Sequence, residues 1–145
     1  MDWLDKSFTE LTNYEVFQIF KLRAVVFNTE QGSAVYDPDD NDPRARHLLC
    51  KDHNRLVAYA RYFVDNDHVT FGRVVIAKDY RGTGLSTPLM NRLLAGIQRY
   101  FPGKEIIIHA QYYIRDYYAK FGFQSFGQTF IEADRKHIKM MHPAL

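Results

Sequence analysis

Residues 74–86 read VVIAKDYRGTGLS, an apolar run followed by a glycine-rich turn and the first residues of a helical pattern. Glycine lets the backbone approach a ligand closely, and the free N–H groups at the start of the next helix point into such a turn. Together with the helix dipole and the charge of Arg81, these groups predict a binding site for phosphate or pyrophosphate. The same spacing also fits an ordinary strand-to-helix turn that binds nothing.

Two other phosphate-binding motifs are excluded by their spacing. A P-loop requires G-x-x-x-x-G-K-[ST], which the chain lacks, and a dinucleotide-binding turn requires G-x-G-x-x-G. Gly82-Thr83-Gly84 begins the second motif, but Thr87 stands where its last glycine belongs. Another kind of nucleotide-binding protein that uses the same turn stays open as an alternative.

The pattern on both sides of this turn predicts an α/β (α+β) protein. Apolar residues at helical spacing predict helices over residues 13–27, 85–101 and 114–121, the first with Asn13 as its N-cap. Runs rich in β-branched and aromatic residues predict strands over residues 47–51, 56–64, 68–77, 105–110, 124–131 and 137–141. With one more strand before the first helix, the order β, α, loop, βββ, α, β, α, ββ predicts a sheet flanked by helices.

The composition predicts one soluble domain. The chain has 145 residues, of which 46% are hydrophobic and 15% aromatic, so it can bury a core and is not a disordered chain. Its net charge of +2 is too small to predict nucleic-acid binding. The apolar runs are too short to cross a membrane, no signal peptide is visible, and Cys50 has no second cysteine to pair with, so we expect a cytoplasmic protein.

Residues 32–46 hold two prolines and four aspartates and are predicted to form a long loop. Counted from Asp37, the segment lacks the glycine and the glutamate that an EF-hand needs, so we expect no metal site there. The loop is instead predicted to be solvated and acidic, which would attract a cationic amine.

Two segments resemble the GNAT superfamily of N-acetyltransferases. Residues 81–86, RGTGLS, are similar to its R/Q-x-x-G-x-G/A signature, with Ser86 in place of the last glycine or alanine. Residues 116–123, DYYAKFGF, resemble a second signature in which a tyrosine precedes Gly-Phe by four residues. Further segments are similar to the ElaA-like branch: residues 22–27, 30–31, 47, 72–74 and 137–140. The resemblance spans nearly the whole chain and implies the GNAT acyl-CoA N-acyltransferase fold, a mixed sheet of six to seven strands in one domain over residues 1–145.

The resemblance implies acetyl-CoA as the co-substrate and no metal. By position, backbone groups of Val74, Val75 and Ile76 would bind the pantetheine and the acetyl carbonyl, and an N–H there would stabilise an oxyanion. The pyrophosphate would be wrapped by Arg81, Gly82, Thr83, Gly84, Leu85, Ser86 and Thr87. Gln111 stands where the family often has asparagine, and it would bond the pantetheine arm.

The implied reaction is direct attack of a neutral primary amine on the acetyl group in a ternary complex. Tyr118 lies at the family's tyrosine position and is the candidate acid at the CoA sulfur. His137 is the favoured general base, since an imidazole titrates near neutral pH, and His47 or a chain of waters is the alternative.

Arg23, Arg73 and His47 are the candidate residues for binding the acceptor amine, a small molecule or a peptide. A guanidinium among apolar residues usually has an anionic partner, which for Arg73 would be a carboxylate or phosphate of the acceptor. For Arg23 the alternative is an internal salt bridge, for example with Glu30. A homodimer is compatible with the resemblance, and a non-catalytic acyl-CoA-binding or sensing module is the alternative function.

Overall fold

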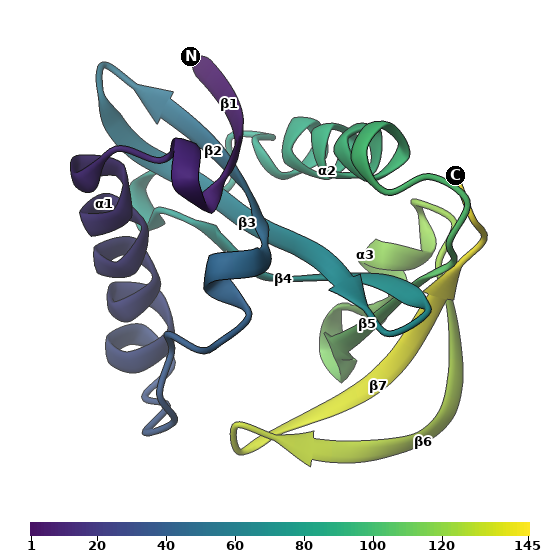
Figure 1. Ribbon diagram of the computed structural model, residues 1–145. Helices are drawn as coiled ribbons and strands as arrows, with labels where there is room; N and C mark the ends of the chain where they lie inside the picture. The colour runs from purple at the N-terminus through teal and green to yellow at the C-terminus, as the bar shows by residue number, and fades with distance from the viewer.

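The computed structural model describes residues 1–145 and contains one seven-stranded mixed sheet with the order β1-β2-β3-β4-β5-β7-β6 (Figure 1). The strands are β1 (Asp2–Ser7), β2 (Arg46–Asp52), β3 (Arg55–Asp65), β4 (His68–Ile76), β5 (Ile106–Gln111), β6 (Gln124–Glu132) and β7 (Arg135–His142). The helices are α1 (Asn13–Arg23), α2 (Ser86–Tyr100) and α3 (Arg115–Ala119), and a π-helical segment, η2 (Ala24–Glu30), continues α1. The predicted order of elements is confirmed.

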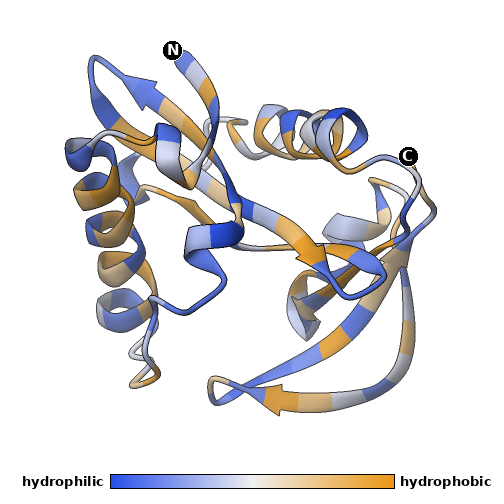
Figure 2. Ribbon diagram, viewed as in Figure 1, coloured by the Kyte–Doolittle hydropathy of each residue, from blue (hydrophilic) through white to orange (hydrophobic).

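Helices cover both faces of the sheet. On β3, Tyr59 packs with Ile19 of α1, whereas Ala58 and Ala60 on the other face belong to the same apolar cluster as Leu89 of α2. This alternation follows from the two-residue period of a strand. Figure 2 shows bands of apolar and polar residues along α2, as expected of a helix that covers a sheet with one face. The buried face of α1 is mostly polar, with Glu15, Gln18 and Arg23 beside Ile19. No helix is long and apolar enough to span a membrane.

The start of α1 is fixed by a capping box that the prediction missed. Thr12, and not Asn13, is the N-cap: its hydroxyl accepts the Glu15 N–H at 3.1 Å, and the Glu15 carboxylate accepts the Thr12 N–H at 2.9 Å. The same buried carboxylate pairs with Lys6 of β1 and Lys51 of β2, each at 2.9 Å. Burial alone would raise the pKa of Glu15, but the Thr12 N–H and the two ammonium groups lower it to about 2. The carboxylate thus joins the first helix to the first two strands.

The sheet separates in its middle. β4 and β5 are its parallel pair, and they are paired at one position, Val69 with Ile106. Beyond this position the two strands diverge, and in Figure 1 the β5–β7–β6 arm turns away from the rest of the sheet. On its other side β4 carries an irregularity opposite β3, and Arg73 in this stretch has a left-handed φ of 50°. Both features lie where the sheet opens.

Candidate active site

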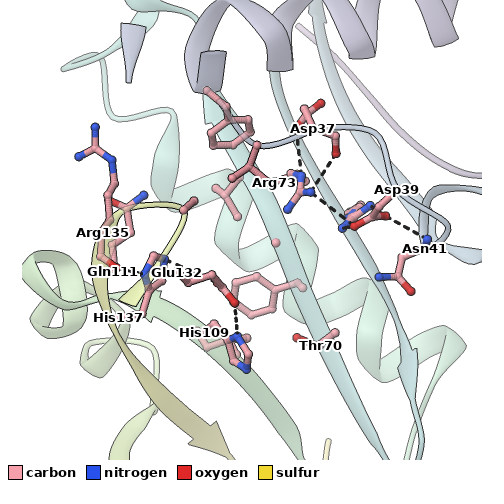
Figure 3. A pocket seen from close by; sticks show the side chains of 18 of the residues that line it. Asp37, Asp39, Asn41, Thr70, Arg73, His109, Gln111, Glu132, Arg135 and His137 are labelled. Carbon is pink, nitrogen blue, oxygen red and sulfur yellow. Dashed lines mark hydrogen bonds and ion pairs between the residues drawn. The ribbon is translucent and has the colours of Figure 1, made fainter. Parts of the chain in front are cut away.

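A cavity of about 530 Å³ lies where the sheet opens. Its walls come from β4, β5, the β6–β7 hairpin and the segment after η2 (Figure 3). The polar residues that line it include Asp37, Asp39, Arg61, Thr70, Arg73, His109, Gln111, Glu132, Arg135 and His137. Loop residues 33–41, which are far from the hairpin in sequence, thus face it across one cavity.

The cavity is bordered by main chain without a sheet partner. After Val69 and Ile106, the edges of β4 and β5 that face each other no longer pair. Buried N–H and C=O groups require partners, so these edges favour a ligand that carries amides of its own. Gln111 at the end of β5 also has a buried side-chain oxygen with no hydrogen-bond partner. A pantetheine arm, with its two amides, fits this set of groups.

The glycine-rich turn lies at the far end of β4, outside the cavity lining. Gly82 and Gly84 have φ of 75° and 82°, which side-chain-bearing residues rarely adopt, and the Thr83 hydroxyl donates to the Tyr80 carbonyl at 2.6 Å. α2 begins at Ser86, so its free N–H groups face the turn. Leu85 is buried in the core, and only its main chain can serve a ligand.

Four further residues of the predicted CoA site are placed as follows. Of Val74, Val75 and Ile76, only Val74 lines the cavity, and the Val75 side chain is buried against α1. Arg81 donates to the Ile76 carbonyl at 3.0 Å and forms an ion pair with Glu30 at 2.6 Å. Its guanidinium stays partly exposed beside the turn.

Tyr118 reaches the cavity from α3. Its ring packs against Phe71 and Phe123, with centroids 6.0 and 6.1 Å away, and its hydroxyl forms no hydrogen bond within the protein. Burial, with a smaller contribution from Tyr117, raises the pKa of Tyr118 to about 12. The hydroxyl is therefore protonated at neutral pH and free to donate.

His137 lies on β7, inside the same cavity. Its Nδ1–H donates to the Arg135 carbonyl at 2.8 Å, and its Nε2 faces an oxygen of Glu132 at 3.8 Å. The other Glu132 oxygen accepts from His109 Nδ1 at 2.9 Å (Figure 3). Hydrogen bonding from His109 lowers the pKa of Glu132, so this carboxylate stays ionised near neutral pH. The Phe130 ring stacks on His137 and meets the His109 ring edge to face.

Two of the predicted acceptor-binding residues are inaccessible. Arg23 is fully buried and pairs with Asp37 at 2.8 Å and Asp42 at 2.7 Å, while Glu30 pairs with Arg81 instead. His47 is also buried, with both ring nitrogens bonded: Nδ1 to the Tyr59 hydroxyl at 2.6 Å and Nε2 to the Asp42 carbonyl at 3.0 Å. Burial lowers the pKa of His47. Neither side chain has a free surface for a ligand, and His47 has no free lone pair to serve as a base.

The predicted solvated acidic loop is instead a partner for buried arginines. Asp42 is buried between Arg23 and Arg61, and Asp39 holds Arg61 through two bonds of 2.5 and 2.8 Å. Asp40 stays exposed. We call the group of three arginines (Arg23, Arg61, Arg73) and three aspartates (Asp37, Asp39, Asp42) the Arg–Asp cluster. Its charges cancel formally, so the loop offers no strong attraction for a cationic amine.

Arg73 is the only member of the predicted acceptor set that lines the cavity. It lies 2.9 Å from Asp37 and 3.4 Å from Asp39, and it donates to the Asp37 carbonyl. In Figure 3 its guanidinium lies between the loop and the cavity. Arg73 therefore anchors the loop to β4, and its charge is already balanced by aspartates.

Sequence reasoning missed His109, Glu132 and Arg135. They come together only through the register of the arm, in which His137 faces Gln111 on β5 and Phe130 on β6. The one available signal was the alternation of Arg135 and His137 on one face of β7.

Known proteins resemble this chain over nearly its full length. The model of the Acetyltransferase (GNAT) domain matches residues 24–142. Protein ElaA of Escherichia coli K12 is 30% identical over 145 residues, which cover 97% of this chain and 95% of that protein. Its crystal structure has a TM-score of 0.93 and covers 98% of this chain and 99% of that one. An acyl-CoA N-acyltransferase from Pseudomonas aeruginosa has a TM-score of 0.94 at 31% identity, over 97% and 98% of the two chains.

Removing the charge of Arg23 tests whether the Arg–Asp cluster is structural. In Arg23→Met, Asp37 and Asp42 stay buried with fewer partners, and we expect the free energy of unfolding to fall by about 3–5 kcal/mol. Urea unfolding measures this loss, with Arg99→Met on the exposed side of α2 as the control, which should change stability by less than about 0.5 kcal/mol. A loss as small as the control's, with a higher KM for the acceptor, would instead make Arg23 a ligand-binding residue.

Proposed function

The chain belongs to the GNAT acetyltransferase family and has its acyl-CoA N-acyltransferase fold, and from this premise we propose that it transfers the acetyl group of acetyl-CoA to the primary amine of a small molecule. The family is the one predicted from the glycine-rich turn and the tyrosine segment. The ElaA-like branch is the one predicted from residues 22–27, 30–31, 47, 72–74 and 137–140. The family supports acyl transfer in general; acetyl-CoA as the donor and an amine as the acceptor are our proposals, as is a cytoplasmic location.

One observation carries the proposal: where β4 and β5 separate, they border a cavity lined by both Tyr118 and His137, and the glycine-rich turn follows the end of β4. The turn supports a pyrophosphate, because two left-handed glycines and the start of α2 expose N–H groups there. The unpaired strand edges and the partnerless oxygen of Gln111 support the pantetheine. In this placement the thioester would lie in the cavity, beside the two candidate catalytic residues.

His137 is suited to take the proton from the amine. Its Nδ1–H is held by the Arg135 carbonyl, so in the neutral ring the lone pair is on Nε2. The ionised Glu132 faces this nitrogen and favours the imidazolium that forms when a proton is accepted. The neutral amine then attacks the thioester carbonyl, and a main-chain N–H at Val74 is the candidate donor to the oxyanion.

Tyr118 is suited to protonate the leaving thiolate. Its ring is buried, and its hydroxyl is protonated at neutral pH and has no protein partner, so it can donate to the CoA sulfur as the C–S bond breaks. A protein that only binds acyl-CoA needs neither this donor nor the Glu132–His137 pair. Catalysis is therefore the better supported of the two functions.

Ligand-dependent thermal unfolding is the direct test of the CoA site. At 100 times its Kd, acetyl-CoA should add about 2.7 kcal/mol to the free energy of unfolding, while ATP and NAD should add little. Gly84→Asp should abolish the gain because its carboxylate repels the pyrophosphate. Gly103→Asp is a matched control, since Gly103 has a similar φ of 81° and equally open surroundings far from the turn. Equal gains in both variants would refute a pyrophosphate site at the turn.

Replacing Tyr118 by phenylalanine tests the acid. The ring and its packing stay, and only the donor is lost, so we expect kcat to fall about 100-fold or more while acetyl-CoA still stabilises the protein. Thiol release with a panel of primary amines measures the rate. Tyr117→Phe is the control, because its hydroxyl does not line the cavity. A Tyr118→Phe enzyme that keeps more than half of kcat rules out this role.

The pH dependence of kcat/KM tests the base. A general base needs the free lone pair on His137 Nε2, so His137→Gln should remove most of the rate together with the acidic limb of the profile. Glu132→Gln should lower kcat/KM, because the carboxylate that faces His137 Nε2 at 3.8 Å is gone. Glu105→Gln on the surface serves as the control. An acidic limb that stays in place in His137→Gln assigns it to another group.

A further inference from the structure

The β6–β7 hairpin carries an unusual pair of opposite charges. Glu132 and Arg135 are register partners on either side of a two-residue turn, Ala133 and Asp134, both with left-handed φ. Opposite charges at directly paired positions usually attract and pair across an antiparallel ladder. Here no ion pair forms between them, although both side chains line the cavity.

Each side chain is turned toward another group. Glu132 is directed at His109, and in Figure 3 the Arg135 guanidinium extends away from Glu132. Its hydrogen bond goes to the Gln31 carbonyl at 3.2 Å, at the C-terminal end of η2. A neutral carbonyl leaves the charge of a guanidinium uncompensated, so Arg135 keeps donors for an anion.

The other arginines of the cavity are already neutralised. Arg61 and Arg73 both belong to the Arg–Asp cluster, where aspartates balance them. Arg135 is therefore the one cavity arginine without a carboxylate partner. Glu132, next to the proposed base His137, is the corresponding anion, and its partner is the imidazole of His109 and not a guanidinium or ammonium group.

We propose that the acceptor is an amine that also bears a carboxylate, an amino acid, with its ammonium group between Glu132 and His137 and its carboxylate on Arg135. This inference rests on the proposed function and names its substrate class. A zwitterion would bridge the two charges that the hairpin holds apart. Its carboxylate accepts the two parallel N–H bonds that a guanidinium offers, and its amine is delivered to the base.

Matched acceptors test the proposal. We would measure acetyl transfer to the standard L-amino acids, to the carboxamide of each, and to diaminobutane. Wild type should prefer at least one free acid over its amide by tenfold or more in kcat/KM, since a charge-assisted contact is lost in the amide. Arg135→Gln should reduce this ratio to near one. Lys136→Gln is the matched control: the same charge is removed one residue along β7, from a side chain that lies over the Tyr112 ring and not in the cavity.

Three outcomes would overturn the proposal. The amides could react as well as the acids in wild type, or a diamine could be the best acceptor. The third outcome is an acid-to-amide ratio of kcat/KM that is as high in Arg135→Gln as in Lys136→Gln. A wild-type protein that acetylates no amine would contradict the proposed function instead. In that case the proposed carboxylate subsite at Arg135 is tested by the binding of amino acids, measured as a change in Tm with CoA present. Amino acids should raise the Tm of wild type and of Lys136→Gln but not of Arg135→Gln, and the absence of any shift with wild type refutes the subsite.

Discussion

The structure depends on one missing set of hydrogen bonds. β4 and β5 are neighbours in the sheet, yet they pair at a single position, Val69 with Ile106. Elsewhere each strand is joined to its neighbours by long antiparallel ladders, so the sheet is continuous on both sides of the opening. The cavity, its main-chain lining and the position of Tyr118 all follow from this separation. A fully paired sheet would bury the same main-chain groups against each other and leave nothing for a ligand.

The Arg–Asp cluster performs the complementary task on the other wall. A buried guanidinium requires carboxylate partners, and Arg23 finds them in the loop after η2. Arg61 on β3 pairs with Asp39 and Asp42, and Arg73 on β4 pairs with Asp37 and Asp39. A segment with little regular structure is thus fixed against two strands. The loop thus becomes a defined wall of the cavity, and the charges that define it are not available to a substrate. Two charges outside the cluster, Glu132 and Arg135, lie on the opposite wall.

Local signals in the sequence were sufficient for most of the fold. The glycine turn, the amphipathic helices and the hairpin turns depend on neighbouring residues, and the strands differ from the prediction mainly at their ends. The first N-cap was misplaced by one residue, although Thr12 and Glu15 have the spacing of a capping box. The Arg–Asp cluster could not be predicted, because its partners lie 14 to 36 residues apart and the pairing depends on how the loop folds back. The residues around Glu132 come together through the register of β5, β6 and β7, which cannot be predicted from the sequence of each strand alone.

The width of the opening has a different physical basis from the rest of the sheet. Strand spacing within a ladder is fixed by hydrogen bonds and hardly varies. Between the diverging parts of β4 and β5, it is set by aromatic packing, in which Phe71 of β4 contacts Tyr118 and Phe123 of the α3 region. Side-chain volume is a quantity that single substitutions change gradually, whereas a ladder is either formed or broken. The dimension of this cleft can therefore drift through evolution by exchanges within the core, without loss of a single main-chain bond.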